Sequence, residues 1–140
     1  KFIEVPGLRF LMTEEDVALP GQPIGKNDRY FKILQLVRRA RESSPQTFRQ
    51  EWAADGTDDA PVRAVGAVRH VRCRVAPGTE PESGTGFDAV RELWWPSAAE
   101  FEAGRARAPQ AWKRLIEARG VDPAATLVVP VDEYRVLWPG

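Results

Sequence analysis

The residue with the clearest chemical potential is the single histidine of the chain, His70. Imidazole titrates nearest to neutral pH among the side chains, which suits His70 to general acid–base work. Residues 64–75 read AVGAVRHVRCRV, an alternation typical of a β-strand. Successive strand residues point to opposite faces, so we place His70 and Arg72 together on one face. Val71 and Cys73 then point the other way, toward the helices. A hydrogen-bonded interface histidine is the alternative interpretation.

A second group of candidates lies in residues 87–95, FDAVRELWW, which we also predict to be a strand. Glu92 is a candidate catalytic carboxylate, although an ion pair with Arg72 is an alternative use. Asp88 is about 13 Å from Glu92 by strand rise, too far for a directly paired acid. Trp94 offers a flat wall against which a ligand could stack. The expected site on one face of the sheet has catalytic His70 and Glu92, with substrate-binding Gln35, Arg72 and Trp94.

Composition excludes several other kinds of site and partner. Lys plus Arg and Asp plus Glu both number 20, so no net charge attracts nucleic acid or an anionic membrane. No apolar run approaches the roughly 18 residues of a membrane span. One histidine and one cysteine, Cys73, exclude Cys-rich and multi-histidine metal sites. No glycine-rich nucleotide loop is present, so we predict neither metal nor cofactor. The lone cysteine and an N-terminus unlike a signal peptide favour a cytoplasmic protein.

The first predicted helix begins at Ser44 and Pro45, an N-cap followed by a proline in the first turn. Phe48 and Trp52 stand four apart and share one face. Gly56 marks the end. The following acidic segment, ADGTDD, lacks a glutamate at calcium-loop spacing, so we interpret it as a solvated turn.

The second predicted helix begins at Ser97, which forms a capping box with Glu100. Pro109 interrupts it, and a further helical stretch ends at Gly120. Two neighbouring tryptophans, Trp94 and Trp95, must face opposite sides of their strand, so Trp95 packs under the helices. The predicted core between helices and sheet is Phe48, Trp52, Leu93, Trp95, Leu115 and Ile116.

Four strands complete the pattern, at residues 31–39, 64–75, 87–95 and 126–138. With the helices they give the order β-α-β-β-α-β, the split βαβ arrangement of an α+β, ferredoxin-like domain. Both helices would then cover one face of the sheet. The other face mixes apolar and charged side chains, which suits a homodimer interface that encloses a polar cavity.

Five short segments resemble the EthD family in order and spacing, and the last of them, VDEYRVL, resembles its terminal strand. KILQLVRR followed by SSPQTFRQEW resembles the opening of that family, and VRHVRCRV resembles its second strand. FDAVRELWWPS resembles its Asp-Gly-Val-x-Glu-Leu-Trp-Phe strand, with Ala89 in place of the glycine. The likeness covers about residues 30–137. It implies a ferredoxin-like fold, a dimeric α/β barrel and action on small organic compounds. Family members often carry a histidine four residues after the helical Trp52, where this chain has Gly56.

The resemblance leaves several functions open. The first is a cofactor-independent lyase or isomerase, for decarboxylation, dehydration or proton transfer on an aromatic or polyketide-like compound. In this interpretation His70 moves a proton, Arg72 holds an anionic oxygen and Trp94 stacks. The second is a non-catalytic small-molecule-binding dimer, which Gly56 favours. A cofactor-free monooxygenase of the same barrel class and a purely structural dimer are further alternatives.

Residues 1–29 precede the expected domain of residues 30–140 as an arm and linker. LMTEEDVAL, at 11–19, resembles VPVDEYRVL, at 129–137, because each has an acidic pair before an apolar end. This arm is either the last strand of a preceding copy of the domain or a segment that packs on its own sheet. Residues 20–28, with two prolines and two glycines, form the linker in both cases.

Overall fold

The structure is a computed structural model that describes residues 2–5, 8–11, 14–19, 29–55, 59–75, 86–118, 120–122 and 127–134. It belongs to the α+β class: among these residues, antiparallel strands form one large and one small sheet, accompanied by helices. β1 (Phe2–Val5) pairs with β2 (Leu8–Leu11) in the small sheet. The main sheet has the order β3-β5-β6-β4-β7. Its strands are β3 (Glu14–Leu19), β4 (Arg29–Val37), β5 (Arg69–Arg74), β6 (Ala89–Trp95) and β7 (Leu127–Tyr134). The four predicted strands are therefore present as β4 to β7, and β3 extends the sheet beyond β5.

The helices are α1 (Pro45–Asp55), α2 (Ala60–Ala64), α3 (Ala98–Arg107) and α4 (Pro109–Ile116). Both predicted N-caps are confirmed. The Thr47 amide donates to Ser44 Oγ at 3.1 Å, and the Glu100 amide donates to Ser97 Oγ at 3.2 Å. The break at Pro109 separates α3 from α4, as predicted. α2 was not predicted, and the strand predicted at residues 64–75 begins only at Arg69.

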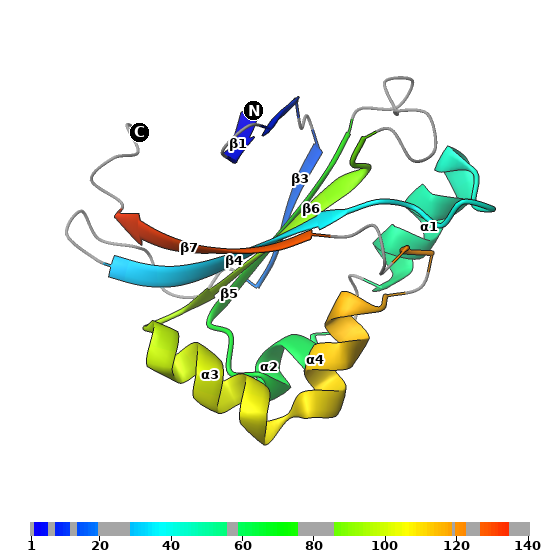
Figure 1. The fold of residues 1–140 in the computed structure, drawn as a ribbon. Helices are drawn as coiled ribbons and strands as arrows, with labels where there is room; N and C mark the ends of the chain where they lie inside the picture. The colour runs from blue at the N-terminus through cyan, green and yellow to red at the C-terminus, as the bar shows by residue number, and fades with distance from the viewer. Residues whose placement is uncertain are drawn as a thin grey trace.

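The helices lie on one face of the main sheet. Figure 1 shows α2, α3 and α4 on one side of the sheet and β1 on the other. Trp95 faces the helices, where its Nε1 donates to the Val65 carbonyl at 2.9 Å. Two clusters fill this layer: Ile33, Val62, Val65, Ala67, Leu93, Trp95, Phe101 and Leu115; and Val37, Phe48, Trp52, Ala89, Ala118 and Val121. The predicted core is thus confirmed, except that Ile116 is only half-buried outside these clusters.

The prediction that Val71 and Cys73 of β5 face the helices, with His70 and Arg72 on the other face, is wrong. In the observed register His70 pairs with Leu93 and Arg72 pairs with Arg91. Paired residues of an antiparallel ladder share a face, so His70 and Arg72 face the helices. Gln35 also pairs with Arg91 and points the same way. Val71 and Cys73 lie on the opposite face.

The error has a physical cause: both faces of this sheet are buried. The face away from the helices holds its own apolar cluster of Leu34, Leu36, Val71, Cys73, Phe87, Val90 and Trp94. Apolar residues in β5 therefore did not have to face the helices. Lys32, Leu34 and Trp94 are only 4–6% exposed within the single chain. The sequence argument for a dimer, that this face could not remain solvated, therefore does not apply to these residues.

Candidate functional site

The helix face of the sheet carries four buried polar side chains, which we call the polar floor: Gln35, His70, Arg72 and Arg91. They lie beneath the C-terminal ends of α1 and α4. The last carbonyls of a helix lack partners within the helix and carry the negative end of its dipole. Cations and amide donors are therefore stabilised in this position, which explains how the sheet tolerates them under the helices.

Arg91 contacts residues of several elements around the polar floor. Its Nη1 donates to the Leu115 carbonyl at 2.7 Å and lies 3.4 Å from Gln35 Oε1. Its Nη2 donates to Asp55 Oδ2 at 2.9 Å. Gln35 Nε2 in turn lies 3.3 Å from the carbonyls of Leu115 and Ile116. One guanidinium therefore connects β4, β6, α1 and α4.

Arg72 connects the floor to α1 through Trp52. Its Nη2 donates to the Trp52 carbonyl, and its guanidinium lies 4.3 Å from the centre of the Trp52 ring. The Arg91 guanidinium lies 5.1 Å from the same ring. Cations over an indole face are attracted by its quadrupole, the more so when water is excluded. Trp52 therefore contacts two arginines of the polar floor and also packs in the apolar core.

Asp55 is the carboxylate closest to this floor, and it corrects an expectation. We had interpreted it as part of a solvated turn, but its side chain is 21% exposed and pairs with Arg91. A carboxylate in the last residue of a helix opposes the helix dipole. The ion pair with Arg91 offsets this unfavourable placement.

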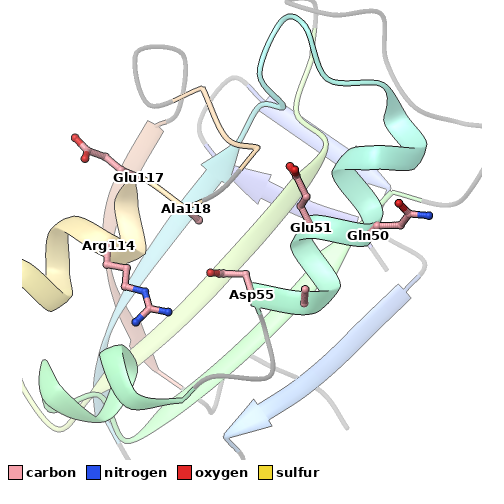
Figure 2. A pocket seen from close by; sticks show the side chains of 7 residues that line it. Gln50, Glu51, Asp55, Arg114, Glu117 and Ala118 are labelled. Carbon is pink, nitrogen blue, oxygen red and sulfur yellow. The ribbon is translucent and has the colours of Figure 1, made fainter.

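A cleft of about 560 Å³ opens between α1 and α4 above Asp55. Its lining consists of Gln50, Glu51, Ala54, Asp55, Arg114, Glu117 and Ala118. Figure 2 shows the side chains of Asp55, from α1, and Arg114, from α4, extending toward one another across the gap. The volume falls within the range of small-molecule sites, roughly 300–1,000 Å³.

A much smaller chamber of about 10 Å³ lies beside the cleft, lined by Asp55, Pro61, Val62, His70, Arg91, Arg114 and Leu115. Asp55 and Arg114 line both spaces. The chamber has room for about one water molecule. His70 is 3% exposed, and neither ring nitrogen has a hydrogen-bond partner.

Burial lowers the pKa of His70 from 6.5 to about 3, and the positive charges of Arg91 and Arg72 act in the same direction. Burial also lowers the pKa of Arg91, which the charge and hydrogen bond of Asp55 partly counteract. His70 is therefore a neutral imidazole near pH 7, with one N–H donor and one acceptor nitrogen.

The five predicted site residues do not form one group. Gln35, His70 and Arg72 belong to the polar floor, whereas Glu92 and Trp94 lie on the opposite face of the sheet. The alternative Glu92–Arg72 ion pair is also wrong, because the two side chains are on different faces.

Glu92 and Trp94 have other partners on their own face. Glu92 Oε1 is 3.6 Å from Lys32 Nζ, and both side chains are buried. Lys32 Nζ and the Arg69 guanidinium each lie 5.1 Å from the centre of the Trp94 ring. Lys32 and Arg69 come from the two strands that flank β6. This group is a compact ion pair and cation–π set.

The cleft residues that sequence reasoning missed are Asp55, Arg91 and Arg114. Arg91 had a signal, since an arginine between Val90 and Glu92 in an otherwise apolar strand must be buried on one face or the other. Asp55 and Arg114 carried none, because their meeting depends on how α1 and α4 are placed.

Within the part of the chain that the structure describes, no three His, Cys, Asp or Glu side chains come together as a metal site. No described helix is both long and apolar enough to cross a membrane. The sequence has no match among protein-family models and no significant match among curated proteins.

Proposed function

We propose that this chain is an EthD-like, cofactor-independent lyase or isomerase that acts on an aromatic or polyketide-like compound in the cleft between α1 and α4. The observation that carries the proposal is the position of Asp55, a carboxylate that faces a cleft of ligand size while Arg91 fixes it from below at 2.9 Å. Proton abstraction next to a carbonyl group needs a positioned base and a cation for the developing oxyanion, without any cofactor.

In the proposed step, an Asp55 oxygen takes a proton from the carbon next to a substrate carbonyl. The electron pair of the broken C–H bond forms a carbon–carbon double bond, and the carbonyl π electrons move onto oxygen. Arg114, which lines the same cleft from α4, stabilises that enolate oxygen. Return of the proton to another atom completes an isomerisation. Departure of hydroxide from the neighbouring carbon, protonated by Asp55, completes a dehydration.

The role first expected of His70 changes in this proposal. An imidazole with a pKa of about 3 is not in its protonated, imidazolium form near pH 7, so His70 cannot act as a general acid there. His70 instead supplies neutral hydrogen-bonding groups behind the cleft. The same property favours the second candidate function, a binding protein without turnover.

We also propose a ferredoxin-like domain in a dimeric α/β barrel. The strand order β5-β6-β4-β7, with helices on one face, supports the first part. β3 of the N-terminal arm pairs with β5 in the same sheet, which fits the interpretation that the arm packs on its own sheet. Light scattering would test the dimer, and a monomer at micromolar concentration would contradict it.

Hydrogen–deuterium exchange on carbon tests the enzymatic proposal. Acetylacetone and hydroxylated acetophenones are incubated with the full chain in deuterated buffer, and loss of the proton signal next to the carbonyl is followed by NMR. We expect exchange above the buffer rate, lowered by about 100-fold or more in Asp55→Asn. Glu102→Gln, which removes the same charge on α3 away from the cleft, should leave the rate unchanged.

The result also separates the two candidates. Exchange that survives in Asp55→Asn would contradict the assigned base. If the probe compounds shift the NMR signals of the cleft residues but their carbon-bound protons exchange no faster than in buffer, the enzymatic proposal is contradicted and the binding protein is favoured.

A further inference from the structure

The small chamber behind the cleft is lined by two residues, His70 and Arg91, that have side-chain nitrogens without a hydrogen-bond partner. Among the described residues, six buried side-chain nitrogens lack a hydrogen bond, and three of them belong to His70 and Arg91. Buried polar atoms in folded proteins are nearly always paired with protein or water. His70 and Arg91 both line the chamber, so their missing partner belongs inside it.

The chemistry of these atoms defines the partner. A neutral imidazole has one N–H donor, and Arg91 Nε–H is a second donor that nothing accepts. His70 and Arg91 both line a space of about 10 Å³, which has room for about one oxygen atom as their acceptor. A hydrocarbon would leave both donors unpaired, and an ammonium group would add a third donor.

The surrounding charges favour an anionic oxygen. The elements around His70 contribute Arg114 from α4, Arg91 from β6 and Asp55 from α1 to the chamber, while α2 contributes uncharged Pro61 and Val62. On its own strand, Arg72 is also close enough to act on His70 electrostatically. Among the described residues, the charged groups around His70 are three guanidinium groups and one carboxylate, which favours an anionic partner.

The outer cleft limits the rest of the ligand. Its lining adds the carboxylates of Glu51 and Glu117, so a group with several negative charges is repelled at the entrance. Asp55 and Arg114 line both spaces, which places the chamber directly behind the cleft floor. A molecule with its body in the cleft can therefore present one oxygen to the chamber.

We propose that the ligand of this cleft is a monocarboxylic acid, one of whose carboxylate oxygens enters the chamber and accepts hydrogen bonds from His70 and Arg91. This inference rests on the proposed function and names its substrate class. The incoming carboxylate counteracts the positive charges of Arg91 and Arg72 around His70.

Benzoate and its neutral isostere benzamide test the inference, since they differ in the anionic oxygen and share shape. Binding to the full chain is measured by calorimetry and by the imidazole carbon–proton NMR signal, which belongs to His70 alone because the chain has one histidine. We expect benzoate to bind about tenfold or more tightly than benzamide and to shift the His70 signal to saturation.

Two variants keep the test specific. His70→Phe should weaken benzoate binding by about tenfold while leaving benzamide unchanged, and His70→Asn, which retains a donor, should restore part of the loss. Thermal unfolding confirms that each variant is folded. Equal affinities for the two probes, benzoate binding without a response of His70, or no binding of either probe would each overturn the inference. The exchange assay with neutral acetylacetone is independent of these outcomes, so the proposed function stands or fails separately.

Discussion

Acidification should destabilise this protein through His70, and replacing His70 should remove that sensitivity. The folded state holds the imidazole with a pKa of about 3, against 6.5 for the exposed group, because burial and the charges of Arg91 and Arg72 disfavour its protonated form. The unfolded chain therefore binds this proton more readily between pH 3 and pH 6.5. Stability from this group is full above the unfolded pKa and is lost as the pH falls toward the folded one.

The expected size follows from the two pKa values. At pH 5 the unfolded state is almost fully protonated at His70 and the folded state is not. The free energy of unfolding should therefore be about 2 kcal/mol lower at pH 5 than at pH 7 from this residue alone. For a domain of this length that corresponds to roughly 4–8 °C in the midpoint of thermal unfolding.

The measurement compares the wild type with His70→Gln, which cannot titrate but keeps hydrogen-bonding groups. Urea unfolding at several pH values between 7 and 5 gives both free energies. Contributions that the two proteins share cancel in the difference. The imidazole NMR signal provides a direct check, since it should not titrate above pH 5. Parallel stability curves for the two proteins, or an imidazole that titrates near 6.5, would refute a buried neutral His70.

Three further predictions concern stability and are measured by urea or thermal unfolding. Trp52→Ala should cost about 3–5 kcal/mol, because it empties a buried site and removes the ring beneath Arg72; a loss below about 1 kcal/mol would mean that α1 packs elsewhere. Asp88→Ala should cost about 3–5 kcal/mol by leaving the buried Arg39 guanidinium without its carboxylate, whereas Asp88→Ala combined with Arg39→Met should recover part of that loss. Gly104→Ala should lower stability by about 1–3 kcal/mol, because the new Cβ would collide with the Val65 carbonyl and push α3 away from α2; an unchanged midpoint would contradict the close approach.

Local signals predicted the elements because each depended on a few neighbouring residues. Ser44 and Ser97 cap their helices as their sequence context requires. The Trp94–Trp95 pair faces opposite sides of the sheet because a strand allows nothing else. α2 was missed because five residues that begin with Ala-Pro carry too little periodicity to distinguish a helix from the start of a strand.

The candidate site could not be predicted in the same way, because its charges depend on what covers each face. An alternating strand identifies which residues share a face but not which face meets the helices. We assumed that arginines avoid the helix side. The structure places Arg72 and Arg91 there, where the C-terminal carbonyls of α1 and α4 accept their hydrogen bonds. Only the positions of the two helix ends could have revealed this.

The two faces of the sheet differ in how their buried polar groups are paired. On the face away from the helices, the buried carboxylate of Glu92 faces Lys32, and Trp94 lies between two cations. These buried charges contact a counter-charge or an aromatic ring, so a structural role is sufficient to explain them. On the helix face, Arg91 also bonds Asp55 and the Leu115 carbonyl near the end of α4, yet its Nε and both nitrogens of His70 still lack partners. Unpaired buried donors lower stability, by roughly 1–3 kcal/mol each. They are retained at little cost where a ligand or a water supplies the missing acceptor, so the remaining hydrogen-bonding capacity points to the chamber behind the α1–α4 cleft.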